Sequence, residues 1–148
     1  MLDRKLVDLV ERDAELLTTR AVKEMLSREE TRHYRNLPEE RVHERVYDVY
    51  NRLGFWLGGE KSKANVKEYY TKLGAQRFHE GIPLSEVIMA LMLIKREMWI
   101  YADENKILTS AFEYRQSLEH NNTVVMFFDR CIYFVALGYE SEQALHAK

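Results

Sequence analysis

The chain has 148 residues, of which 46% are hydrophobic and 31% charged, a composition typical of globular proteins. Its 22 basic and 24 acidic side chains give a net charge of −2. This balance argues against a dedicated nucleic-acid-binding protein, which usually carries a basic excess, and the length predicts one domain spanning residues 1–148.

The residues that break helices predict an all-α fold. Only two prolines and six glycines occur, they fall between helical patterns, and no long stretch alternates apolar and polar residues. Residues 2–28 read as one or two helices with a possible bend at Thr18-Thr19, and the polar residues 27–37 as a loop or a solvated helical turn. We expect a single bundle of about five to seven helices.

Proline and glycine set the limits of the next helices. Pro38 and the two glutamates after it begin a helix that runs to about Leu57. Proline suits the first helical turn, and acidic side chains suit the positive end of the helix dipole. The pair Gly58-Gly59 ends this helix, and the next one covers residues 63–80.

The chain is organised around residues 69–101, which contain a break at Gly81-Ile82-Pro83. The helix after the break, about residues 84–102, has apolar side chains on nearly all sides for its first turns. Such a helix is buried, so we expect it at the centre of the fold. Residues 107–144 contain another helix or two, part packing on the core and part facing a second subunit.

Catalytic motifs are missing from the sequence: no nucleophile elbow, P-loop or dinucleotide fingerprint occurs, and we predict no enzyme. Cys131 lies among apolar residues and is interpreted as a buried structural thiol. Glu40 and His43 have the Glu-x-x-His spacing of di-iron bundles, but this charge-rich segment is interpreted as a solvated helix face, so we predict no metal site. Three histidines in polar surroundings are predicted to be surface residues: His33, His120 and His146.

Arg77 is the residue that most suggests a binding site. It falls on the apolar side of its helix, whereas His79 faces the polar side. An unpaired buried charge is costly, so Arg77 either pairs with an internal acid or lines a pocket and holds an anion. The candidate ligand-binding residues are Arg77, Tyr70, Leu73, Trp56 and Trp99, although such aromatic residues are more often plain core.

Neither a signal peptide nor a transmembrane helix is predicted. The N-terminal stretch carries charges throughout, and the longest apolar candidate, Ile82 to Ile94, is shorter than the ~18 residues that a membrane span needs. Cys131 is the one cysteine, so no intrachain disulfide can form. We therefore expect a reducing, cytoplasmic location without membrane insertion.

The stretch LGAQRFHEGIPLSEVIMAL resembles a known family. Leu73-Gly74, Arg77-Phe78, the Gly81-Ile82-Pro83-Leu84 break and the apolar helix after it resemble the N-terminal sensor domains of RsbR-type bacterial signalling proteins. In particular, the stretch resembles the RsbRD N-terminal domain, found ahead of histidine kinases and STAS output domains. The resemblance implies a non-catalytic sensory input domain that forms a homodimer. Its C-terminal helix would lead into an output domain after residue 148.

The same stretch is distantly similar to globin-coupled sensors, which implies a globin-like or related fold. Those proteins read roughly Ile-Gly-x-x-His-x-x-x-Gly-Leu-Pro, and Arg77 occupies the position of their iron-ligating histidine. His79 lies two residues further on, about 200° around the helix. The resemblance therefore implies a sensor without haem that binds a small apolar or anionic ligand.

Two other functions stay open. A ligand-free dimerisation module would have a well-packed core without a cavity, and a redox or haem sensor would recruit His79 or Cys131. For the sensory domain we expect helix 84–102 to repack against the C-terminal helix. A ligand drives such a change only if it binds one state more tightly than the other.

Overall fold

The computed structural model describes residues 2–105 and 111–147; their side chains are described except at 2–4, 59–62, 111–123 and 125. Over these residues the chain forms seven α-helices, one 3-10 helix and no strand, so the predicted all-α class is confirmed. The elements in chain order are α1 (Leu2–Arg12), α2 (Ala14–Ser27), η1 (Glu29–Asn36), α3 (Glu39–Asn51), α4 (Leu53–Leu57), α5 (Gly59–His79), α6 (Leu84–Glu104) and α7 (Ala111–Leu145).

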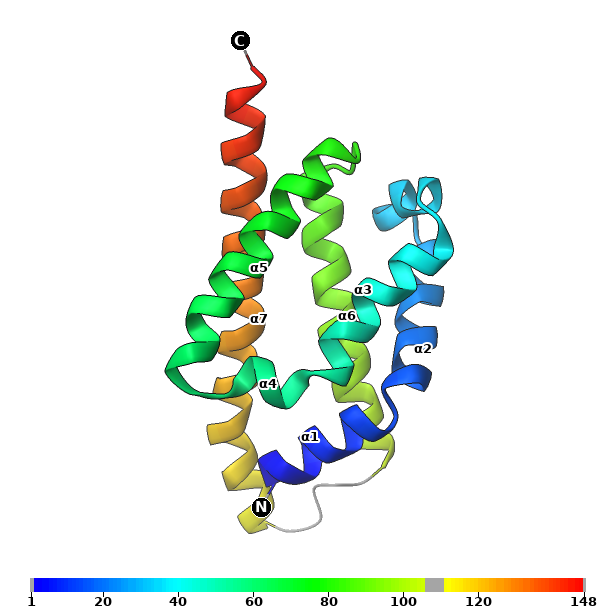
Figure 1. Cartoon of the computed structure of the whole chain (residues 1–148). Helices are drawn as coiled ribbons and strands as arrows, with labels where there is room; N and C mark the ends of the chain where they lie inside the picture. Colours follow the sequence, from blue (N-terminus) through cyan, green and yellow to red (C-terminus); the bar gives the residue numbers. More distant parts are fainter. Residues whose placement is uncertain (1, 106–110, 148) are drawn as a thin grey trace.

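Helices α5 and α7 run side by side in the same direction along one edge of the molecule (Figure 1). Two glycines let their backbones touch. A Cβ on Gly74 would lie 2.0 Å from the Val135 carbonyl oxygen, and a Cβ on Gly138 would lie 2.0 Å from the Thr71 carbonyl oxygen. Because no side chain fits at either position, glycine is needed for this close approach.

Helix α6 contributes the centre of the core, as predicted for residues 84–102. It packs against α2, η1, α5 and α7, and the hydroxyl of Tyr50 on α3 donates a buried hydrogen bond of 2.6 Å to the Ile94 carbonyl oxygen. Met92 and Ile100, however, are exposed. The helix is therefore buried on most of its circumference and keeps one open side.

The predicted break at Gly81 is a Schellman turn that ends α5. Gly81 has a φ of 75°, which glycine adopts without strain. Its N–H donates to the Phe78 carbonyl oxygen at 3.0 Å, and the N–H of Ile82 donates to the Arg77 carbonyl oxygen at 3.2 Å. The Tyr139 hydroxyl donates to the Ile82 carbonyl oxygen at 2.7 Å, so α7 holds this turn directly.

The helix predicted from Pro38 to Leu57 is interrupted at Arg52. There the backbone has φ −116° and ψ 25°, which separates α3 from α4. The Arg52 guanidinium lies 4.4 Å from the centre of the Phe55 ring, and the N–H of Gly54 donates to a Glu11 carboxylate oxygen at 2.9 Å. The second of these contacts connects α4 to α1, against which it packs.

Other boundaries also differ from the sequence prediction, among them the start of α5, which lies at Gly59 rather than at residue 63. The N-terminal helix breaks at Asp13 rather than at Thr18-Thr19, and Thr18 sits inside α2 with its hydroxyl donating to the Ala14 carbonyl oxygen at 2.7 Å. The polar segment 27–37 forms the 3-10 helix η1. No helix in the described ranges is both long and apolar enough to cross a membrane.

Candidate ligand-binding site

A small cavity lies in the core between α2, η1, α3, α5 and α6. Its volume is about 30 Å³, enough for about two water molecules. Aliphatic side chains form much of its wall, and the larger polar side chains are Tyr34, Arg45, Tyr69, Tyr70 and Arg77. A mostly apolar cavity with a few polar groups is the usual form of a small-molecule site in a helical fold.

Three arginines surround the carboxylate of Glu80 beside this cavity. Arg45 binds it with two hydrogen bonds of 3.0 and 2.7 Å, Arg77 with one of 2.9 Å, and Arg41 lies 3.7 Å away. The Arg77 and Glu80 side chains are only 5% and 11% exposed. One carboxylate thus faces three guanidinium groups, and this cluster carries an excess of positive charge.

The arginines also control the protonation of Glu80. Desolvation by burial raises the pKa of Glu80, but the hydrogen bond from Arg45 and the charge of Arg77 outweigh it and hold this pKa below its ordinary value. Burial raises the pKa of Tyr34, and the charge of Arg77 opposes that rise. At neutral pH the cavity is therefore bordered by a charged Glu80 and a neutral Tyr34.

Of the predicted site residues, Arg77, Tyr70 and Leu73 line the cavity, while Trp56 and Trp99 are not part of its wall. Arg77 pairs with an internal acid, one of the two interpretations from the sequence, although its Nε atom has no hydrogen-bond partner. Trp56 packs beside Tyr70, with ring centres 5.7 Å apart, and Trp99 is partly buried on α6.

Sequence reasoning missed Arg45. A signal for it exists, since Arg45 follows Val42 by three residues and precedes Val49 by four, which puts all three on the buried face of α3. An arginine at such a position needs an acidic partner, as Arg77 does. Its partner Glu80 lies 35 residues away in sequence and is recognisable only in the fold.

Cys131 is buried, as predicted, and lies beside the hydroxyl of Tyr70. This hydroxyl is buried without a hydrogen-bond partner of normal geometry. Burial raises the pKa of the Cys131 thiol and of Tyr70 well above their ordinary values, so both groups are neutral. A neutral, enclosed thiol is a poor nucleophile, and the site offers no covalent chemistry through it.

His33, predicted at the surface, is partly buried. Its backbone N–H donates to a Glu86 carboxylate oxygen at 2.9 Å, and its ring Nδ1 contacts the other carboxylate oxygen. Among the described side chains Glu86 is the one acid that is buried, and this pair connects η1 to the first turn of α6. The side chain of His120 lies outside the described residues.

The comparisons with known proteins give one match. A family profile described as the RsbT co-antagonist protein rsbRD N-terminal domain matches residues 15–148, a range that includes every element around the cavity. No curated protein and no solved structure matches the chain significantly. The match covers nearly the whole chain and agrees with the resemblance carried by the residues around Arg77. The chain therefore belongs to the family of rsbRD N-terminal domains, a family of regulatory domains.

Proposed function

We propose that this chain is the cytoplasmic, non-catalytic sensory input domain of a signalling protein of the co-antagonist or histidine-kinase type. We further propose that it binds a small anion in the cavity beside Arg77. Family membership supports the regulatory role. One observation carries the choice of ligand: three arginines share a single carboxylate at the cavity, and Arg77 keeps a buried, unpartnered Nε.

Ligand entry requires the core to rearrange, because about 30 Å³ holds no organic molecule. A carboxylate or a similar anion would take the place of Glu80 on Arg77, since charge-assisted hydrogen bonds to guanidinium are among the strongest in proteins. Arg45 would keep the displaced Glu80 in its two hydrogen bonds. The exchange therefore leaves no buried charge without a partner.

The position of Glu80 connects the cavity to the end of the chain. Glu80 is the C-terminal cap of α5 and directly precedes the Gly81 turn, whose Ile82 carbonyl oxygen accepts the Tyr139 hydrogen bond from α7. Moving Glu80 would shift this turn and with it α7, which we propose leads into an output domain after residue 148. A ligand that binds the shifted state more tightly would then change the output.

The test is a titration with small carboxylates, from acetate to decanoate, at constant ionic strength, read as the rise in melting temperature. Arg77→Gln should abolish the rise, and Glu80→Gln should enlarge it because the competing internal carboxylate is gone. The matched control is Arg20→Gln, which removes an exposed arginine whose partner is Glu104. If Arg77→Gln responds like the unmodified chain, Arg77 does not hold the ligand.

A second proposal concerns self-association. Met126, Tyr133 and Leu137 are exposed and are spaced by seven and four residues, so they form one apolar face of α7. Tyr133 is 62% exposed, although its ring centre lies 5.4 Å from that of its neighbour Phe134. We propose that a second copy of the chain covers this face, as a dimerisation module requires.

Sedimentation at several concentrations tests this second proposal. Tyr133→Glu should yield monomers, whereas Leu16→Glu, at an exposed apolar residue on α2, should leave the dimer intact. A dimer that retains no carboxylate would favour a ligand-free module over a sensor. A monomeric unmodified chain at high concentration would reject dimerisation through this face.

A further inference from the structure

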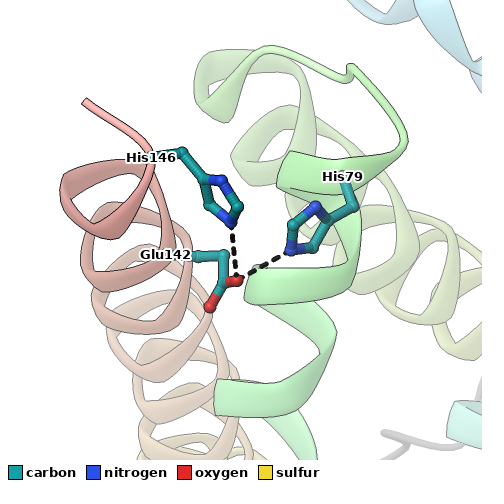
Figure 2. Close-up of side chains that lie close together, drawn as sticks. All are labelled: His79, Glu142 and His146. Carbon is teal, nitrogen blue, oxygen red and sulfur yellow. Dashed lines mark hydrogen bonds and ion pairs between the residues drawn. The ribbon is translucent and has the colours of Figure 1, made fainter. Parts of the chain in front are cut away.

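Three potential metal ligands meet where the ends of α5 and α7 lie side by side (Figure 2). His79 is the last residue of α5, Glu142 lies in the last turn of α7, and His146 directly follows α7. The His79 Nε2 is 2.7 Å and the His146 Nε2 is 3.3 Å from the same Glu142 carboxylate oxygen. The three ligand atoms lie within 4.8 Å of one another.

We propose that His79, Glu142 and His146 form a binding site for a divalent metal ion of the zinc type. Two imidazoles and one carboxylate are a frequent zinc ligand set, which leaves one coordination position open. In a tetrahedral site, ligand atoms lie roughly 3.3 Å apart, as His146 and Glu142 already do. His79 and His146 are 52% and 54% exposed, so their side chains can adjust and an ion can enter from solvent.

The surrounding structure orients both imidazoles toward Glu142. The N–H of His146 donates to the Glu142 carbonyl oxygen at 3.3 Å, so His146 continues the face of α7 on which Glu142 lies, one turn further on. The His146 ring stacks on Phe78 with ring centres 5.7 Å apart, and the His79 ring meets the edge of Phe78 at 5.4 Å. Phe78 thus holds both rings, which reduces the ordering that metal binding requires.

Two other histidine–carboxylate pairs in the described part of the chain show what is special about this site. His43 lies 2.9 Å from a Glu15 carboxylate oxygen, and His33 contacts Glu86. Each pair has a single imidazole, whereas the site at the ends of α5 and α7 has two that converge on one oxygen. The pair of His43 and Glu15 therefore serves as an internal control for nonspecific metal binding.

An ion at this site would join segments 63 residues apart in sequence. It would cross-link the end of α5, two residues before Gly81, to the end of α7. A metal that binds the folded chain and not the unfolded chain raises the melting temperature by mass action. This inference stands apart from the cavity around Arg77, because none of the three ligands belongs to the cavity wall.

The experiment is a titration of the purified chain, freed of any polyhistidine tag and treated with a chelator, with Co²⁺ and then Zn²⁺. We expect one equivalent of Co²⁺ to produce a visible absorption band. Zn²⁺ should then displace the bound Co²⁺ and remove this band. His79→Ala and His146→Ala should each weaken Co²⁺ binding at least about tenfold, since even indirect ligand supports cost that much. His43→Ala should bind Co²⁺ with the same affinity as the unmodified chain.

Glu142→Gln provides a variant of nearly the same shape that removes the carboxylate, and circular dichroism checks that each variant stays helical. Zn²⁺ should raise the melting temperature of the unmodified chain and of His43→Ala, but not that of His79→Ala. Two results would overturn the proposal. One is the absence of a visible absorption band after one equivalent of Co²⁺ has been added. The other is a Zn²⁺ affinity that is the same in the unmodified chain and in the variant that carries both His79→Ala and His146→Ala.

Discussion

Gly74→Ala tests the contact between the backbones of α5 and α7. The added Cβ would lie 2.0 Å from the Val135 carbonyl oxygen and 2.9 Å from the Tyr139 nitrogen. Carbon and oxygen atoms of neighbouring helices come no closer than about 3.3 Å, so the two helices must separate by roughly 1.3 Å at this point. Rotation of a side chain cannot relieve the clash, because the nearest atoms all belong to the backbone.

The expected cost follows from two opposing effects. Overpacking a well-packed core typically costs about 1–3 kcal/mol, and a clash with backbone belongs at the upper end of that range. Against this cost, alanine has a higher helix propensity than glycine, which stabilises the helix by about 0.8–1 kcal/mol. The free energy of unfolding should therefore fall by about 2 kcal/mol, which lowers the melting temperature of a chain this size by roughly 4–8 °C.

Urea unfolding followed by circular dichroism measures this change. Gly138→Ala should cost about as much, since its Cβ would lie 2.0 Å from the Thr71 carbonyl oxygen. The loss of unfolding free energy in the double variant should be smaller than the sum of the losses in the two single variants, because helices separated by the first alanine leave room for the second. The matched control is Gly54→Ala, whose Cβ would meet only side-chain atoms of Glu11 and Val7, at 3.2 Å. If Gly74→Ala is as stable as the unmodified chain, the two backbones are not in contact in solution.

Three further predictions concern single buried groups. Glu80→Gln should destabilise the chain at neutral pH, and the difference should shrink as acid titrates the wild-type carboxylate. The folded pKa of Glu80 lies below its ordinary value of 4.5, so its stabilisation is present above that pH and lost below it, which urea unfolding across pH can follow. Cys131 should react with a thiol reagent only as fast as the chain opens, because burial encloses the thiol and raises its pKa; rapid labelling of the native chain would contradict this. Tyr50→Phe should lower the free energy of unfolding by about 1–2 kcal/mol through the lost hydrogen bond to Ile94, and an unchanged melting temperature would argue against that bond.

Local chemistry was enough to predict some elements from the sequence. Gly81 requires a positive φ and Pro83 cannot continue a helix, so the end of α5 and the start of α6 follow from these residue types. The break at Arg52 did not follow, because it depends on a carboxylate of α1 that binds the backbone of Gly54. No pattern within residues 38–57 contains that partner.

The candidate site was also predictable only in part. The apolar face of its helix identified Arg77 as buried, but Trp99 occupies a comparable face of α6 and lies outside the cavity wall. Periodicity assigns a side chain to the interior without saying which part of the interior it reaches. The spacing of Glu142 and His146 was visible in the sequence, whereas their approach to His79 depends on the parallel course of α5 and α7.

The crossing at Gly74 and Gly138 also defines a pivot for α7. At about 1.5 Å per residue, roughly 39 Å of this helix precedes the crossing and roughly 12 Å follows it. A lever with arms in this ratio turns a tilt of its long arm into an opposite displacement about a third as large at its short arm. The helix would thus act as a lever, so that a large displacement before the crossing becomes a small displacement at the end of α7.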